Sequence, residues 1–254
     1  MLHPWLLPVL FVTGLAAGFV DSIAGGGGLI TLPVLLSFGL GPQQALGTNK
    51  LQGTFGSGSA SWHFVRAGTV SFSECARGFL FSLVGAACGA LAVQHLDPSL
   101  LSRAIPILLI AVALYTLLKP GLGERDLHPR MPRFWFDLLF GLGLGFYDGF
   151  FGPGTGTFWA MAFMLALGFN MTRATASTKL MNFASNLASL LFFILGGNVL
   201  LLPGLTMGIG QLIGAKIGSH MVVTRGTKFI RPIFLTVVLA LALKLLYATF
   251  LGKG

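Results

Sequence analysis

The feature that most constrains this chain is a succession of long apolar segments that contain almost no charged residues. Of the 254 residues, 54% are hydrophobic and only 9% are charged, and the mean hydropathy is +0.84. Runs of about 18 or more nearly uncharged residues are long enough to cross a bilayer. In lipid, the backbone satisfies its hydrogen bonds only as helices or as a closed barrel, and these runs are too long for barrel strands. The sequence therefore predicts an all-α polytopic membrane protein.

The apolar segments fall into two groups of five, and the second group repeats the first. Asp21 in GFVDSIAGGG corresponds to Asp148 in GFYDGFFGPG, and Lys50 in ALGTNKL corresponds to Lys179 in ATASTKL. We therefore expect a duplicated fold, with one membrane repeat over 1–118, a linker over 119–133 and a second repeat over 134–254. The expected segments are 5–22, 29–39, 42–65, 75–94, 99–118, 134–147, 156–168, 172–195, 203–221 and 229–251.

The net charge of +9 comes from basic residues that cluster in short loops. This pattern is typical of membrane orientation, because cytoplasmic loops are enriched in Lys and Arg, and it argues against a nucleic-acid partner. Loop 66–77 is basic whereas its counterpart, 196–203, is uncharged, as expected if the two repeats are inverted and both termini lie outside. The linker is expected in the cytoplasm, since it carries Lys119, Arg125, Arg130 and Arg133.

Glycines interrupt each repeat at the same place. The first repeat has four in a row, Gly25, Gly26, Gly27 and Gly28, and the second has FGPGTG. The apolar segment that follows, 29–39, would be about 16 Å long as a helix, half of the bilayer core. Each repeat is thus expected to hold a re-entrant hairpin with a short helix, plus three spanning helices. The free N–H groups that begin the short helix would attract an anion, whereas close helix packing is the alternative role for a single glycine.

Four charged residues fall inside the apolar segments: Asp21 and Asp148 beside the breaks, and Lys50 and Lys179 in the helices that follow. Each would cost roughly 2.5–3.5 kcal/mol at the bilayer centre, so they must pair or line water. One interpretation is a static Asp–Lys pair in each half. The other makes the lysines anion ligands and the aspartates their orienters or proton-titrating groups. Polar residues such as Asn182 continue from the lysines at helical spacing, as expected for a hydrated path.

The motifs GFVDSIAGGGGLITLP, ALGTNKLQGTFGSGSASWHF, GFYDGFFGPGTGTFW and ATASTKLMNFASNLASLLFF cover both halves. With them the chain resembles the TauE/SafE sulfite exporter family, also called the toluene sulfonate uptake permease family, and in particular its YfcA-type branch. The resemblance implies a bacterial inner-membrane transporter of small anions, often sulfite or organosulfonates. Together with Asn182 from the polar stripe, the implied substrate-binding residues are Gly25, Gly26, Gly27, Gly28, Asn49, Lys50, Gly152, Gly154, Thr155, Gly156, Thr178 and Lys179, with Asp21 and Asp148 in coupling or charge pairing.

We therefore expect a transporter, with export as the expected direction, that works by alternating access with the anion held near the midplane between the two glycine breaks. An anion channel would need the same ligands and is the first alternative. An intramembrane enzyme that uses Asp21 and Asp148 as an aspartyl dyad is the second, and we expect no enzyme activity. No cofactor or metal is expected. The expected partners are a small inorganic or organic anion and the lipid bilayer, and a homo-oligomer stays open.

Overall fold

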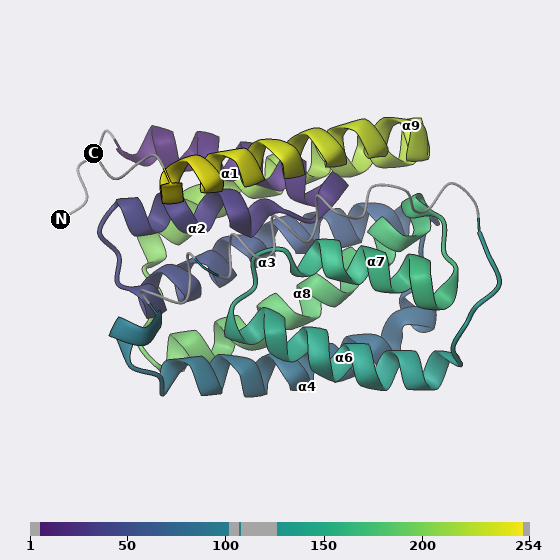
Figure 1. Ribbon diagram of the computed structural model, residues 1–254, viewed down its shortest axis with the longest axis horizontal. Helices are drawn as coiled ribbons and strands as arrows, with labels where there is room; N and C mark the ends of the chain where they lie inside the picture. Colours follow the sequence, from purple (N-terminus) through teal and green to yellow (C-terminus); the bar gives the residue numbers. More distant parts are fainter. Residues whose placement is uncertain (1–5, 102–106, 108–125, 251–254) are drawn as a thin grey trace.

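The computed structural model describes residues 6–101, 107 and 126–250, with side chains described up to residue 226. Every regular element in this part of the chain is a helix, and the long helices lie side by side with the short helices α2 and α7 among them (Figure 1). The helices are α1 (Leu6–Ala24), α2 (Gly27–Ser37), α3 (Pro42–Arg66), α4 (Phe72–Gln94), α6 (Arg133–Phe150), α7 (Thr155–Leu167), α8 (Met171–Leu195) and α9 (Leu201–Phe250).

The expected segments match these helices to within three residues at most ends. The all-helical fold is therefore confirmed for the described residues. The expected segments 203–221 and 229–251 both lie in α9, where non-helical geometry at Gly226 (φ 62°, ψ −161°) separates two helices, as expected. Most of segment 99–118, the linker up to residue 125 and both chain ends lie outside the described residues.

Each half places its first helix against the last described helix of the other half. Helix α1 packs along α9, and α6 packs along α4. Glycines make both contacts close: a Cβ added at Gly14 or Gly18 would collide with the α9 backbone, and one added at Gly85 or Gly89 would collide with α6. Close packing, the alternative offered for single glycines, is thus the role of these four residues.

The contacts also fix the directions of the long helices. Gly14 meets Met207 and Gly18 meets Gln211, so α1 and α9 run the same way, whereas Gly47 of α3 meets Phe193 of α8 and Gly53 meets Asn186. Helices α3 and α8 therefore run in opposite directions where they touch at the centre of the molecule (Figure 1).

By length and apolar character, three helices of the described part could cross a membrane: α1, α4 and α8. The short helices α2 and α7, of 11 and 13 residues, reach only about 16 and 20 Å. Both are buried within the protein: Leu32 and Leu35 of α2 belong to one apolar core, and Trp159 and Phe163 of α7 belong to another. Protein therefore surrounds the backbone at both interruptions.

Candidate functional site

The first glycine break is shorter than the sequence suggests. Helix α1 ends at Ala24 and α2 already begins at Gly27, so only Gly25 and Gly26 are non-helical. Gly25 has φ +78°, a left-handed conformation that side chains other than glycine adopt only with strain. The expectation that all four glycines form the turn is wrong, because Gly27 and Gly28 can provide the first turn of α2 instead.

The second break occupies residues 151–154, between α6 and α7. Gly152 and Gly154 have φ values of +96° and +83°, and Pro153 stands between them. Thr155 and Gly156, expected in the turn, already belong to α7. The Thr155 hydroxyl donates to the Gly152 carbonyl at 2.6 Å, which ties the break to the start of the helix.

The two breaks touch each other although they lie in different halves of the sequence. A Cβ added at Gly25 would come within 2.5 Å of the Gly156 carbonyl carbon, and one added at Gly28 would lie 3.2 Å from Pro153. The Thr157 hydroxyl crosses between the halves and donates to the Ala24 carbonyl at 3.1 Å. The structure thus brings the starts of α2 and α7 together at one place.

Free backbone donors face this place from both sides. The Gly27 N–H donates to Oδ1 of Asp21 at 3.2 Å, but the N–H groups of Gly28 and Gly156 donate to no acceptor in the described part of the chain. Both belong to the first turn of a helix, where the backbone dipole favours negative charge. Two unpaired donors therefore point from opposite halves toward one region.

The four buried charges form two ion pairs that cross between the halves. Lys50 Nζ lies 2.6 Å from Asp148 Oδ1, and Lys179 Nζ lies 2.9 Å from Asp21 Oδ2. Both lysine side chains are only 1% exposed, Asp148 is 5% exposed and Asp21 is 18% exposed. The interpretation of one pair within each half is wrong, because each lysine is neutralised by the other half. The Ser185 hydroxyl also donates to Asp148 Oδ2.

A cavity of about 40 Å³ lies between the breaks, large enough for about three water molecules. The carboxylates of both ion pairs reach it, whereas Lys50, Lys179, Gly26, Gly27 and Thr178 are not among its lining residues. Its wall is almost entirely polar and glycine backbone, with Asp21, Gly25, Gly28, Asn49, Gln52, Gly53, Asp148, Gly152, Gly154, Thr155, Gly156, Asn182, Asn186 and Gln211.

Three side-chain amides on the cavity wall carry an oxygen with no hydrogen-bond partner in the described structure: Gln52, Asn182 and Gln211. All three are at most 5% exposed. A buried polar atom without a partner costs about 1–3 kcal/mol, so a hydrogen-bond donor that enters the cavity would relieve that cost. Asn49 differs, since its Oδ1 accepts from Thr31 at 2.5 Å and from Gln52 at 2.7 Å.

Of the residues expected to bind substrate, most of the glycines and Asn49, Thr155 and Asn182 line this cavity. Thr178 lies elsewhere: its hydroxyl donates to the Ala174 carbonyl, and it lines a small apolar cavity beside Lys179. The cavity residues that are not among the expected substrate-binding residues are Gln52, Gly53, Asn186 and Gln211. Polar character inside an apolar segment was the available signal for Gln52, Asn186 and Gln211, whereas Gly53 carries no such signal. No group of three or more His, Cys, Asp or Glu in the described ranges could hold a metal ion.

Apolar helices around buried, paired charges and a small polar cavity define a helical membrane transport protein. The chain belongs to the sulfite exporter TauE/SafE family, whose model matches residues 10–245. It is 48% identical to the probable membrane transporter protein YfcA of Escherichia coli K12, over 97% of this chain and 92% of that protein.

The similarity extends to other bacteria. A probable membrane transporter protein of Haemophilus influenzae is 44% identical over 95% of both chains. The probable membrane transporter protein YunE of Bacillus subtilis is 26% identical over 94% of this chain and 97% of that protein. No solved structure matches the chain. The expected family and the coarse function, a multi-pass membrane transporter, are therefore confirmed.

Proposed function

We propose that the protein carries a small oxyanion, sulfite or a compact sulfonate, across the bacterial inner membrane, with the anion bound in the cavity between the two breaks. The observation that supports this most is the convergence of two free helix-start N–H groups, from Gly28 and Gly156, on one buried cavity. Backbone donors at helix starts bind anions without a preference for one oxyanion over another. The family description, sulfite exporter, agrees in ligand class.

The ion pairs give the site its charge balance. Two lysines and two aspartates sum to zero, and the aspartates line the cavity whereas the lysines do not. An entering anion is repelled until a carboxylate takes up a proton or turns away. We therefore assign Asp21 and Asp148 the role of coupling groups: when either is neutralised, Lys179 or Lys50 is released and its charge becomes available to the anion.

The cavity also limits the size of the ligand. Its volume of about 40 Å³ suits a single sulfur oxyanion in this conformation, and a larger organosulfonate would require the two halves to move apart. Asn182 and Gln211 add side-chain amides whose NH2 groups can donate to an anion, whereas the NH2 group of Gln52 already donates to Thr31 and Asn49.

Alternating access follows from the duplication. The opposite directions of α3 and α8 support two inverted repeats, with each half packed against a helix of the other. In secondary transporters built this way, one repeat or bundle rocks against the other around a fixed site. The breaks of this protein would form that fixed point. On this model the linker is cytoplasmic and both termini are outside.

The enzyme alternative has less support. An aspartyl dyad needs two carboxylates that share one proton, but here each carboxylate is paired with its own lysine.

Reconstitution into proteoliposomes tests the proposal. We expect sulfite-dependent flux that needs Lys50 and Lys179, and we expect Arg130→Gln, an exposed substitution away from the cavity, to leave the flux unchanged. Flux that exceeds carrier turnover and never saturates would indicate a channel. Absence of flux for sulfite, sulfate, thiosulfate and sulfoacetate, from protein shown to be folded, would remove the proposal.

A further inference from the structure

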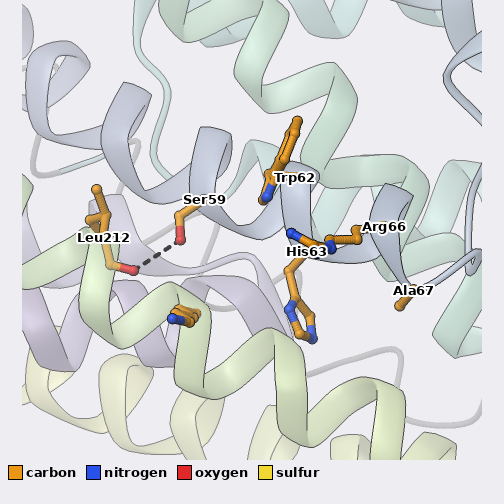
Figure 2. Close-up of a pocket in the computed structure, with 7 residues that line it drawn as sticks. Ser59, Trp62, His63, Arg66, Ala67 and Leu212 are labelled. Atoms are coloured by element: carbon orange, nitrogen blue, oxygen red, sulfur yellow. Dashed lines mark hydrogen bonds between the residues drawn. The ribbon is translucent and has the colours of Figure 1, made fainter.

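A second cavity, much larger than the first, opens between the last turns of α3 and the middle of α9. Its volume is about 640 Å³, and Figure 2 shows the side chains that line it. Ser59 donates to the Leu212 carbonyl at 3.0 Å and joins the two helices at one side of the cavity. The lining residues are Ser59, Trp62, His63, Arg66, Ala67, Leu212 and Lys216.

The polar part of this cavity is basic. Arg66 and Lys216 line it from different helices, and none of the residues lining it is acidic. Neither cation takes part in an ion pair found among the described residues. His63 points from α3 toward α9 (Figure 2), and its ring centroid lies 5.6 Å from the ring centroid of His220. Nε2 of His63 is buried without a hydrogen-bond partner in the described structure. The described residues therefore give this cavity positive charge and no counter-ion.

The internal duplication provides a control for what the fold itself requires. At the offset that pairs Lys50 with Lys179, His63 corresponds to Phe192, and Arg66 corresponds to Leu195. On the partner helix, Lys216 corresponds to Ala87 and His220 corresponds to Leu91. Every basic group of the cavity is thus replaced by an apolar residue at the equivalent place in the other half. The fold forms the same helix pairing there without these charges, so they serve something other than packing.

The rest of the wall is apolar and open. Trp62 is 70% exposed and Leu212 is 41% exposed, and Ala67 closes the end of α3. A lone oxyanion would leave most of the 640 Å³ empty, since the central cavity that we assign to such an ion measures about 40 Å³. The dimensions and the lining fit an amphipathic ligand with an anionic head and an apolar body. Exposed tryptophan at a helix end is typical of the depth at which lipid headgroups lie.

We propose that this cavity binds the headgroup of an anionic phospholipid, with Arg66 and Lys216 on its phosphate diester and the acyl chains along Trp62 and Leu212. Basic pockets between membrane helices bind such headgroups because the lipid supplies negative charge and apolar surface together. The site is separate from the central cavity and shares none of its lining residues. It would hold α3, which carries Lys50, against α9.

The test uses the full chain purified in a neutral detergent and native mass spectrometry, with phosphatidylglycerol as the probe and phosphatidylcholine as the zwitterionic control. We expect retention of phosphatidylglycerol in preference to phosphatidylcholine. Since each basic residue contributes on the order of 1 kcal/mol to attraction of anionic lipid, Arg66→Gln and Lys216→Gln should each weaken retention about fivefold. Arg130→Gln, an exposed cation outside the cavity, should leave it unchanged.

Three outcomes would overturn the proposal. The first is equal retention of both lipids by the unaltered protein. The second is unchanged phosphatidylglycerol retention in the Arg66→Gln/Lys216→Gln double variant, whose folded state is checked by its thermal midpoint in detergent alone. The third is a thermal shift with sulfite, lost in that double variant, without any shift with phosphatidylglycerol, which would assign the cavity to the transported anion. None of these readouts depends on transport through the central site.

Discussion

Lys50 in the first half of the chain pairs with Asp148 in the second, at 2.6 Å between Nζ and Oδ1, inside a contact where both side chains are almost fully buried. In the equivalent pair, the lysine, Lys179, comes from the second half and the aspartate, Asp21, from the first. The two halves are therefore joined at their centre by two reciprocal charge contacts, on either side of the cavity that we assign to the anion. These contacts connect the stability of the protein to its proposed transport cycle.

Substitutions at the Lys50–Asp148 pair should separate the effect of the pair on stability from its effect on transport. Lys50→Met leaves Asp148 as a buried charge without a counter-ion, and breaking a buried pair costs about 3–5 kcal/mol. The double variant Lys50→Met/Asp148→Asn removes both charges, so we expect its thermal midpoint to recover toward that of the unaltered protein while sulfite flux stays absent. Thermal unfolding in detergent and flux in proteoliposomes measure the two effects. Flux in the double variant would show that this pair only holds the fold together.

The contact between the breaks can be tested with two matched glycines. Gly25 and Gly39 have almost the same φ, +78° and +79°, but only Gly25 faces a neighbour, the α7 backbone near Gly156, whereas nothing lies within 4 Å of a Cβ added at Gly39. Gly39→Ala should cost about 1–2 kcal/mol from left-handed strain alone. Gly25→Ala adds a backbone collision and should prevent folding or lower the thermal midpoint much further. Equal losses in the two variants would contradict the close approach of the halves.

The unpartnered amides predict a variant that loses binding without losing stability. Asn182→Ala removes a buried oxygen with no partner, so we expect an unchanged or higher thermal midpoint together with at least a tenfold higher KM for sulfite. Asn49→Ala is the control, because Asn49 accepts from Thr31 and Gln52 and its loss should lower the midpoint. An Asn182→Ala protein with wild-type KM would exclude this amide from the site.

A separate ionic cluster joins the starts of α4 and α6. The side chain of Asp137 is 1% exposed. Its Oδ1 lies 2.8 Å from Nε of Arg133, and its Oδ2 lies 3.6 Å from Nε of Arg77. Arg133 also donates to the Glu74 carbonyl. Asp137→Asn should therefore lower stability by about 1.5–3 kcal/mol, since the charged hydrogen bond from Arg133 loses its carboxylate acceptor. Arg77→Gln, at a side chain that is 59% exposed, should cost less than about 1 kcal/mol. Chemical denaturation of both variants gives the comparison, and similar losses would show that Arg77 carries the cluster.

The helices could be predicted from the sequence because long apolar runs leave few alternatives in a membrane. The ion-pair partners of Lys50 and Lys179 could not be predicted from the sequence. In a duplicated chain, a pair within each half and a pair between halves use the same residues and balance the same charges, so only the packing of the halves distinguishes them. The expectation that Thr178 lies at the central cavity was wrong as well. Thr178 occupies the position of Asn49 in the repeat, yet its hydroxyl donates to a carbonyl of its own helix and it lines a different cavity.

The crossed pairs also set an order on biosynthesis. Lys50 and Asp148 are 98 residues apart, and Asp21 and Lys179 are 158 apart. As the chain leaves the ribosome, Asp21 and Lys50 enter the membrane well before their partners exist, so the insertion machinery must shelter both charges until the second half arrives. A truncated first half would retain Asp21 and Lys50 without the partners that each contacts in the folded protein. If the two halves were translated separately in one cell, each would supply the ion-pair partners that the other lacks.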